Sequence, residues 1–228
     1  MKPELDPVWE DKIYGEGSHL NRYPFDAVVS FIYRWRPRDK PVSETAVVEV
    51  GSGAGNNLWF AAREGFRVAG IEGSATAVRY ARERFKNEKL MGDLREGNFL
   101  ALPWEDDSFD IAIDRHSLCC VSLKAQKTAI SELKRVLRSG GVLFYNGYSD
   151  QHTSAKYGHR QSDGRVVNIT SGTLAGVGGL TFCTMQDIEK LFAFGWEIMK
   201  LEHCIIEDAP NTSAASNHAE WRVIVRKR

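Results

Sequence analysis

The chain has 228 residues, 43% of them hydrophobic, which is enough to bury a substantial core in one domain of ordinary size. Thirty basic residues balance thirty acidic residues, so the composition lacks the positive excess of a dedicated nucleic-acid binder. No apolar stretch approaches the roughly 20 residues of a membrane-spanning helix, and the four cysteines show neither zinc-type spacing nor a secreted disulfide framework. We therefore expect a soluble, cytoplasmic, single-domain protein without nucleic-acid or membrane partners.

The first 45 residues are rich in aromatic side chains and lie outside the regular pattern that follows, so we expect a helical cap over one end of a sheet. From residue 46 onward, short β-rich runs alternate with amphipathic stretches, which indicates a mainly parallel sheet covered by helices. Strands are predicted at 46–50 and 67–72. A helix is predicted over 56–65, and a second one begins after its N-cap Ser74 and ends near residue 87.

The middle of the chain continues this alternation. Residues 96–118 should hold a short third strand, a proline-anchored loop and a fourth strand at 109–114. An amphipathic helix over 123–139, ended by Gly140 and Gly141, should lead into a fifth strand at 142–148.

The last third of the chain contains an insertion and a closing unit. Residues 148–181 are too many for an ordinary connection and predict a lid or small inserted element, although a solvated loop or an extra strand at 165–170 are alternatives. A helix follows over 184–195, with Thr184 as its N-cap and Gly195 as its end. Residues 196–208 and 219–228 predict an antiparallel strand pair at the sheet edge.

Three glycines, at 51, 53 and 55, follow the first predicted strand. They allow a sharp turn and let backbone N–H groups approach a polar ligand. The sixth position of the dinucleotide fingerprint is Asn56 and not glycine, which weakens a pyrophosphate site. Glu72 ends the second strand, where a carboxylate accepts from ribose hydroxyls. Taken alone, the segment fits NAD, S-adenosylmethionine or a plain strand–turn–helix.

The run "GNFLALPWEDDSFDIAID" (97–114), followed by an amphipathic helix and "LRSGGVLFY" (137–145), resembles the class I S-adenosylmethionine-dependent methyltransferases. The resemblance covers about residues 46–147. It implies an α/β, Rossmann-like, doubly wound sheet of seven mainly parallel strands with an antiparallel C-terminal pair. The chain would then divide into a cap (1–45), a cofactor-binding core (46–147), a lid (148–181) and a C-terminal helix with the strand pair (182–228).

The resemblance also implies the cofactor contacts. S-adenosylmethionine, with S-adenosylhomocysteine as its product, would place its methionine part among Glu49, Gly51, Ser52, Gly53 and Gly55. Its ribose would lie on Glu72 beside Gly73 and Ser74, and its adenine on Asn98, Phe99 and Leu100. Two residues depart from the commoner aspartate of the family, Glu72 and Asn98, and both keep an acceptor oxygen.

Residues after the fourth strand, "IDRHSLCC" (113–120), should face the transferred methyl group if the family geometry holds. Asp114 would touch the methionine amino group. His116, whose ordinary pKa lies near neutrality, would be a general base, with a structural histidine as the alternative. Arg115 would clamp a carboxylate or phosphate of the acceptor, with a local ion pair as the alternative.

The cap and the insertion should complete the site. We assign Tyr14 and Arg22 to the cofactor, and His19, Tyr148 and His152 to the acceptor. Since methyl transfer is an in-line displacement that needs mainly orientation, no metal is expected, and the sequence shows no compact ligand cluster. The polarity of the insertion favours a small polar acceptor.

We therefore predict methyl transfer to an oxygen or nitrogen of a small polar molecule. The chain has no Asn/Asp-Pro-Pro-Tyr run after the fourth strand, which disfavours amino-methylation of nucleic acid or protein. Two alternatives remain: a nicotinamide-dependent oxidoreductase, which would need the missing third glycine and a Tyr-x-x-x-Lys set, and a non-catalytic cofactor-binding partner subunit. The acceptor and the oligomeric state stay open.

Overall fold

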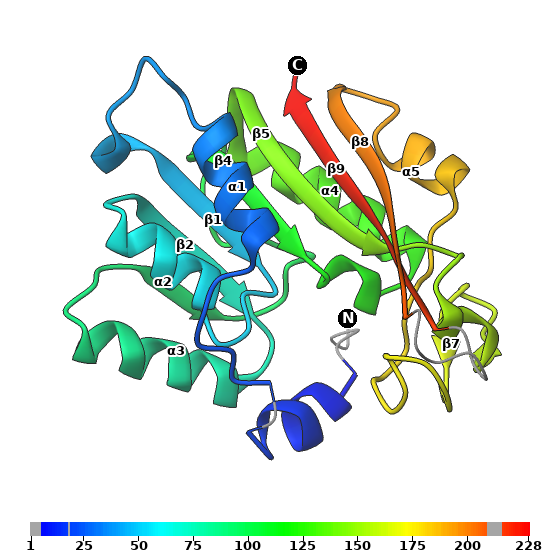
Figure 1. Ribbon diagram of the computed structural model, residues 1–228. Coiled ribbons are helices and arrows are strands. Elements are labelled where there is room, and N and C mark those ends of the chain that lie inside the picture. The colour runs from blue at the N-terminus through cyan, green and yellow to red at the C-terminus, as the bar shows by residue number, and fades with distance from the viewer. Residues whose placement is uncertain (1–5, 18, 209–215) are drawn as a thin grey trace.

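The computed structural model describes residues 6–17, 19–208 and 216–228. Within them, one seven-stranded sheet has the order β3-β2-β1-β4-β5-β9-β8 (Figure 1). Strands β1 to β5 are parallel, whereas β9 is antiparallel to both β5 and β8. The predicted α/β class, with a mainly parallel sheet and an antiparallel C-terminal pair, is confirmed. The strands are β1 (Ala46–Val50), β2 (Arg67–Glu72), β3 (Asp93–Glu96), β4 (Phe109–Arg115), β5 (Leu137–Tyr148), β8 (Trp196–Glu207) and β9 (Asn217–Lys227).

Helices cover both faces of this sheet (Figure 1). Helices α1 (Asp26–Trp35), α2 (Asn56–Arg63) and α3 (Ala75–Asn87) share one core cluster with Val47 and Ile113. Helices α4 (Leu123–Val136) and α5 (Met185–Leu191) share the other cluster with Val48 and Ala112. Because neighbouring residues of a strand face opposite sides, the central strands are apolar on both faces.

Local side-chain chemistry fixes where two of the predicted helices begin. The Ser74 hydroxyl accepts from the Ala77 N–H at 3.1 Å at the start of α3. Thr184 and Asp187 form a reciprocal capping box at the start of α5. Both predicted N-caps are therefore confirmed, and each satisfies an N–H group that has no partner inside the helix.

Three predicted boundaries are wrong. The third strand lies at Asp93–Glu96 and not within 96–118. Helix α4 ends at Val136, and β5 begins at Leu137, so Gly140 and Gly141 lie inside the strand. The reason is a register shift between β4 and β5, which Gly140 accommodates with φ +76°. Helix α5 ends at Leu191, before Gly195.

The cap contains a π-helix, η1 (Trp9–Tyr14), helix α1 and a 3-10 turn, η2 (Val42–Glu44). A further 3-10 turn, η3 (Leu118–Cys120), follows β4. The insertion holds a 3-10 turn, η4 (Thr153–Lys156), and a separate two-stranded sheet of β6 (His159–Arg160) and β7 (Val166–Val167). The extra strand considered for 165–170 is thus only β7.

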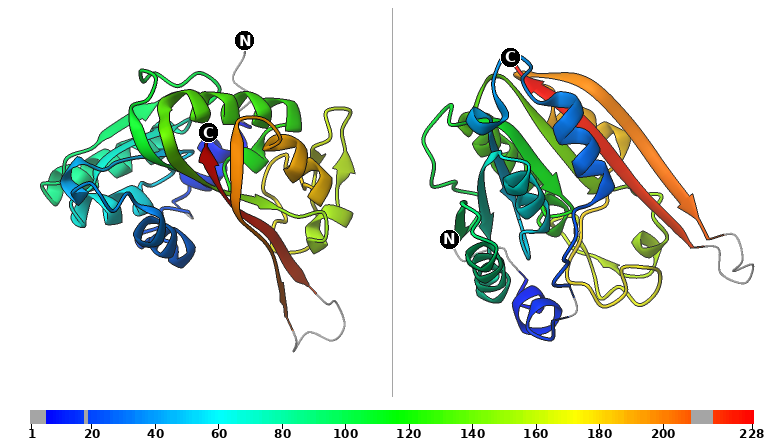
Figure 2. Two further views of the ribbon diagram at one scale, coloured as in Figure 1. Left: turned by 90° about the horizontal axis from the view of Figure 1, so that it is seen from above. Right: turned by 60° about the vertical axis from the view of Figure 1, so that its left-hand side comes forward.

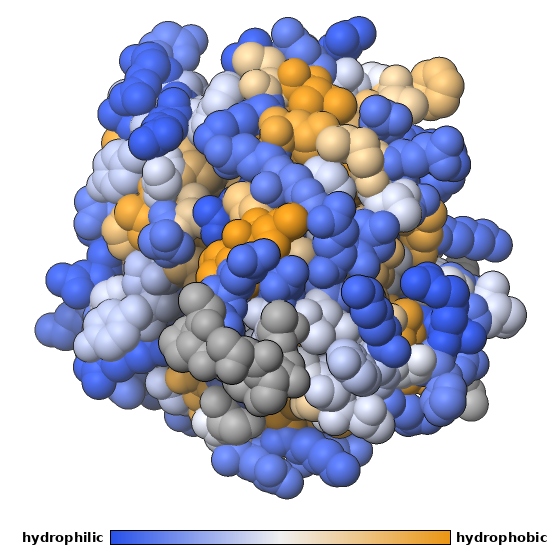
Figure 3. Space-filling view, turned by 45° about the vertical axis from the view of Figure 1, so that its right-hand side comes forward, coloured by the Kyte–Doolittle hydropathy of each residue, from blue (hydrophilic) through white to orange (hydrophobic). Residues whose placement is uncertain are grey.

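The cap and the insertion meet, because the Gly179 N–H donates to Oδ2 of Asp6 at 3.1 Å. Figure 2 shows the β8–β9 pair extending beyond the helical layers at its Glu207 and Asn217 end. Figure 3 shows a mainly hydrophilic surface with separate apolar areas on the face turned forward there. In the described part of the chain, no helix is both long and apolar enough to cross a membrane. A cytoplasmic location stays a prediction.

Candidate active site

A cavity of about 680 Å³ opens at the carboxyl ends of β1, β2 and β4. Its size lies in the range of small-molecule sites, about 300–1,000 Å³. The order of the sheet reverses between β1 and β4, which is where open α/β sheets bind ligands. The cavity therefore lies where the topology favours a binding site.

We divide its lining into two parts. The glycine-loop end follows strands β1 to β3 and is lined by Tyr14, Glu49, Gly51, Ser52, Gly53, Glu72, Gly73, Gly97, Asn98 and Phe99. The insertion end follows β4 and β5 and includes residues of the cap, the insertion and β9. It is lined by His19, Phe25, Arg115, His116, Val121, Tyr148, Thr173, Leu174, Val177, Leu180 and His218.

The glycine loop packs too closely for side chains. Gly51 has φ +60°, and a Cβ there would lie 2.1 Å from Cβ of Ser117. Gly53 has φ +51°, and its Cβ would lie 2.7 Å from the Tyr14 hydroxyl. Glycine is thus required at both positions by the left-handed backbone and by the approach of a neighbour. Tyr14 lies over the loop as part of η1.

Glu72 is held firmly at the end of β2. It is buried, its Oε2 accepts from the Gly53 N–H at 2.9 Å, and its Oε1 accepts from the Ser74 N–H at 2.8 Å. Burial raises the pKa of this carboxyl, while the hydrogen bonds from backbone N–H groups oppose that rise. Because each carboxylate oxygen has a second acceptor position, Glu72 can still accept from two hydroxyls of a ligand.

Glu49, at 2% exposure, is the second buried acid at this end. Its Oε1 accepts from Nδ2 of Asn57 at 2.7 Å, whereas its Oε2 has no hydrogen-bond partner among the described residues. Burial, supported by the charges of Asp114 and Glu72, raises the pKa of Glu49 to about 8. A buried acceptor without a donor is costly, so the arrangement suits a ligand that brings an N–H group.

Asn98 and Phe99 follow β3 and complete the glycine-loop end. Oδ1 of Asn98 accepts from the Leu100 N–H at 2.9 Å, which orients the side chain and leaves one acceptor position on the oxygen. The Gly97 N–H donates to the Glu72 carbonyl at 2.9 Å and so joins this turn to the end of β2.

At the insertion end, Arg115 is the last residue of β4. Its guanidinium lies 4.2 Å from the ring centroid of Phe25 and contacts Nδ1 of His116. No carboxylate of the described residues forms an ion pair with it, so the local ion pair considered above is not formed there. A cation on the cavity wall with an aromatic ring behind it can hold an anionic group.

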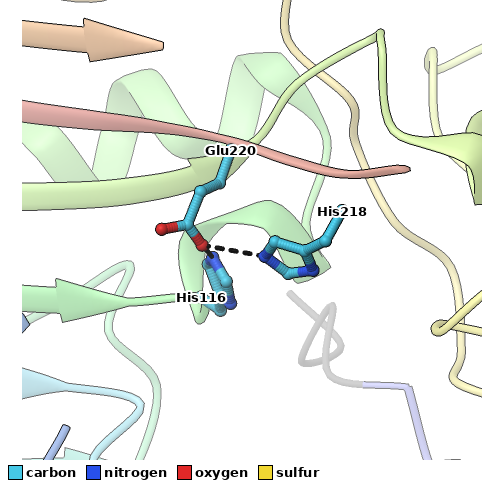
Figure 4. A group of neighbouring side chains, drawn as sticks. All are labelled: His116, His218 and Glu220. Atoms are coloured by element: carbon cyan, nitrogen blue, oxygen red, sulfur yellow. Dashed lines mark hydrogen bonds and ion pairs between the residues drawn. The ribbon is translucent and has the colours of Figure 1, made fainter. Parts of the chain in front are cut away.

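His116 follows Arg115 with φ +59°, an uncommon backbone conformation outside glycine. Its Nε2 lies 3.1 Å from Oε2 of Glu220, and Nε2 of His218 lies 3.0 Å from the same oxygen (Figure 4). Burial lowers the pKa of His116 to about 3, so the ring is neutral near pH 7. The ring of Tyr148 lies 4.1 Å away, centroid to centroid.

Burial opposes the ionisation of Glu220, but hydrogen bonding from His116 and His218, with further help from Arg222, outweighs it and holds the pKa of this carboxyl below its usual range. His116, His218 and Glu220 are also the group of possible metal ligands found among the described residues, with ligand atoms within 4.8 Å of one another. The sequence showed no compact cluster because β9 is far from residue 116 along the chain.

Six predicted site residues do not line the cavity. Asp114 is fully buried, and its Oδ1 accepts from the Ser117 and Leu118 N–H groups at 3.0 and 2.9 Å. It therefore turns back to begin η3 and does not face a ligand. His152 is also buried. Its Nδ1 accepts from the Ser154 N–H at 3.1 Å, so the ring is directed toward the start of η4.

The other four serve the scaffold. Arg22 is exposed, and its carbonyl accepts from Arg84. Gly55 is the left-handed N-cap of α2, and Ser74 is the buried N-cap of α3. Leu100 packs against the core cluster on the α4 side of the sheet. In each case the residue lies next to the cavity along the chain while its side chain or backbone is used elsewhere.

Several lining residues were not predicted. Asn57 is the second residue of α2, and four other segments contribute Phe25, Val121, Leu174, Val177, Leu180 and His218. No local motif marks them, since an isolated aliphatic residue or histidine has many possible roles. The aliphatic residues of the insertion, such as Leu174 and Val177, were the available indication of an apolar wall. The many polar residues around them led to the prediction of a polar acceptor.

Comparison with known proteins assigns the central part of the chain. Residues 48–145 match the family described as methyltransferase domain. An uncharacterised protein of Haemophilus influenzae is 32% identical over 108 residues, which cover 46% of this chain and 41% of that protein. Botryococcene C-methyltransferase of Botryococcus braunii is 36% identical over 97 residues, which cover 41% of this chain and 25% of the relative. These similarities span less than half of either relative.

A solved structure shares the whole architecture. The structure of a SAM-dependent methyltransferase of Methanosarcina mazei superposes with a TM-score of 0.70 at 17% sequence identity. The match covers 90% of this chain and 98% of the other. At this identity the likeness concerns the fold, and it extends well beyond the matched residues 48–145.

Proposed function

We propose that this chain is a class I S-adenosylmethionine-dependent methyltransferase, which moves a methyl group from that cofactor to a small molecule bound at the insertion end of the cavity. The matched methyltransferase domain at residues 48–145 and the shared fold support the predicted family, enzyme class and cofactor. The acceptor, the reacting atom and the contact residues are part of the proposal.

The observation that carries the proposal is the pair of buried carboxylates beside the glycine loop. Glu49 offers an oxygen without a donor, which fits the amino group of the methionine part. Glu72 is held by two backbone N–H groups and offers its remaining acceptor positions to the ribose hydroxyls. Asn98 and Phe99 would hold the adenine, and Tyr14 would cover the loop.

When bound, S-adenosylmethionine supplies an electrophilic methyl group, so the chain mainly has to orient the acceptor and exclude water. The insertion end provides an apolar wall of Val121, Leu174, Val177 and Leu180. Although the insertion is polar in composition, its aliphatic residues face the cavity. We therefore propose an acceptor with an apolar body, in place of the small polar molecule expected from composition.

Polar groups at this end are few and clustered. His116 is neutral near pH 7 and can accept a proton from an acceptor hydroxyl or amine. Arg115 would hold an anionic group of the acceptor, with His19 and Tyr148 beside it. Transfer to oxygen or nitrogen remains our first proposal.

Transfer to carbon is the second candidate, because an aliphatic wall suits a hydrocarbon and because the relative from Botryococcus is named a C-methyltransferase. Transfer to oxygen or nitrogen would use His116 to accept the proton that the acceptor loses. Transfer to a carbon–carbon double bond would not need a base before the methyl group is transferred.

Calorimetric titration of the full chain with S-adenosylmethionine and with S-adenosylhomocysteine tests the cofactor assignment. We expect one binding site for each and none for NAD, which serves as the control. Absence of measurable binding of both adenosyl compounds would overturn the proposed activity. A screen with labelled methyl donor over phenols, amines, apolar carboxylates and alkenes then separates the acceptor candidates.

A further inference from the structure

Glu220 is a carboxylate on β9, the strand next to the edge strand β8. It pairs with Tyr148 of β5 on one side and with Cys204 of β8 on the other, and its side chain is 2% exposed. A charge in this position is unfavourable unless donors surround it. Glu220 is not part of the cavity wall, so contact with a ligand does not explain it.

Three side-chain nitrogens lie close to this carboxylate, and those of Arg222 and His218 form hydrogen bonds with it. Nε of Arg222 lies 2.6 Å from Oε1, while Nε2 of His218 and Nε2 of His116 lie 3.0 and 3.1 Å from Oε2. Figure 4 shows both rings directed at the same oxygen. An ionised carboxylate only accepts hydrogen bonds, so Nε2 of His218 carries its proton. Nε2 of His116 lies close to the same oxygen without the alignment of a hydrogen bond, and a lone pair at that place would be repelled by the carboxylate, which favours a proton on this nitrogen too.

The other nitrogen of His116 agrees with this assignment. Nδ1 contacts NH1 of Arg115, and a guanidinium can only donate, so Nδ1 presents its lone pair. Arg115 lines the cavity, whereas Glu220 does not, which places Nδ1 on the cavity side of the ring. The Tyr148 ring packs against the imidazole and limits its rotation.

Two histidines and a carboxylate are also a common metal-binding set. Ligation through Nε2 of His116 would require that its proton move to Nδ1, where Arg115 already donates. The guanidinium groups of Arg115 and Arg222 would in addition repel a divalent cation at this place. The contacts therefore favour a hydrogen-bonded network.

We propose that Glu220 is a positioning residue that fixes His116 as its Nε2–H tautomer and presents the Nδ1 lone pair to the insertion end of the cavity. There Nδ1 takes the proton that the acceptor loses as its oxygen or nitrogen is methylated, once an anionic group of the acceptor has drawn Arg115 away. The role of the lone pair as a base rests on the proposed methyl transfer. The tautomer of His116 is a property of the ligand-free chain and does not depend on that proposal.

Long-range ¹H–¹⁵N correlation NMR of the full chain, labelled with ¹⁵N-histidine, reads the tautomer without any substrate. His116 and His218 are assigned by the loss of their signals in His116→Asn and His218→Asn. We expect His116 at neutral pH to show a protonated Nε2 and an unprotonated Nδ1. A ring protonated at Nδ1, or at both nitrogens, overturns the proposal.

Matched variants test the role of the carboxylate. Glu220→Gln should give His116 a mixture of tautomers and lower turnover at least tenfold, whereas Glu220→Asp, which keeps the charge, should restore the single tautomer. Glu202→Gln, the same change on an exposed part of β8, should match the parent. If Glu220→Gln does not fold, the spectrum of the parent protein still shows whether Nε2 of His116 is protonated.

One equivalent of Zn²⁺ added to the labelled chain provides the last test. We expect the signals of His116 and His218 to stay unchanged. Stoichiometric binding that shifts both sets of signals would identify a metal centre and overturn the network. Since none of these spectra depends on methyl transfer, they remain informative even if the chain binds no S-adenosylmethionine.

Discussion

The two ends of the cavity differ in how they are built. At the glycine-loop end, most contacts come from residues directly after β1, β2 and β3, within short stretches of chain. At the insertion end, neighbouring side chains come from the cap, β4, the insertion and β9. The proposed cofactor site is therefore formed by local sequence motifs. The proposed acceptor site is formed by segments that lie far apart in the chain.

Their buried acids differ as well. Glu49 has one oxygen without a donor, and its pKa rises to about 8. Glu220 is equally buried, yet its contacts with His116, His218 and Arg222 hold its pKa below the usual range. Burial alone therefore does not decide the charge of an acid, because nearby donors and cations oppose the effect of burial. We interpret Glu49 as an acceptor prepared for a ligand and Glu220 as a residue that orients its neighbours.

The largest expected effect concerns Glu72. Glu72→Ala should weaken S-adenosylmethionine binding more than 100-fold, about 3 kcal/mol, because hydrogen bonds to a charged acceptor contribute roughly 1.5–3 kcal/mol each. The loop is also affected, since Gly53 and Ser74 lose their acceptor. Calorimetry measures the change, and the exposed Glu105→Ala is the control. Unchanged affinity would remove Glu72 from the cofactor site.

His116→Asn tests whether the two ends act separately. Turnover should fall about 100-fold, since general-base catalysis contributes roughly 10²–10⁴. Cofactor affinity should stay within about twofold of the parent, because His116 lies at the insertion end. Initial rates and calorimetry on the same samples give both values, with the exposed His159→Asn for comparison. A parallel loss of cofactor affinity would break the division proposed here.

Glu49 should make cofactor binding release a proton. With a pKa of about 8 it is largely protonated at pH 7 in the ligand-free chain, and a bound ammonium group favours its ionised form. Calorimetry at pH 7 in buffers of different ionisation enthalpy should detect release of up to about one proton. Glu49→Gln should abolish the release and weaken binding about tenfold; release that persists in this variant points to another group.

The same group sets a pH dependence of stability. Its folded-state pKa of about 8 lies above the ordinary 4.5, so the folded chain binds more protons between these values. The free energy of unfolding should therefore fall as the pH rises through this window, and less steeply in Glu49→Gln. Urea denaturation at pH 5, 6.5 and 8 measures this. Equal slopes for both proteins would argue against the raised pKa.

Asn98 should give the smallest effect. Asn98→Ala removes one neutral acceptor for the adenine, about 1 kcal/mol, so cofactor affinity should fall about fivefold. The side chain is exposed and already accepts from Leu100, which limits its contribution. Calorimetry with adenosine and inosine as competitors checks the assignment. An equal effect of the substitution on both nucleosides would mean that Asn98 does not read the amino group.

Much of the fold followed from patterns in the chain. Apolar runs bounded by turn residues placed β1 and β2, and side-chain caps at Ser74 and Thr184 placed two helix starts. Errors arose where tertiary pairing overrides a local rule. Gly140 ends a helix by the usual rule, but pairing of Leu137 with Phe109 had already begun a strand.

The candidate site divides in the same way. Gly51, Ser52 and Gly53 of the glycine loop lie around the cavity, since a motif fixes the backbone and so the direction of nearby groups, while Gly55 begins α2. Asp114 follows from the motif around β4, yet its carboxylate turns to the N–H groups of Ser117 and Leu118. Sequence position does not specify which of several near donors a carboxylate selects.

The sequence by itself determined most of the sheet and indicated the residues of the glycine-loop end, because those depend on hydrophobic periodicity and on motifs of residues close together in the chain. Only the tertiary structure decided the insertion end. Antiparallel pairing of β9 with β5 brings Glu220 and His218 to His116, and folding of the insertion turns Leu174 and Val177 toward the cavity. These contacts join distant parts of the chain, so no local pattern could reveal them.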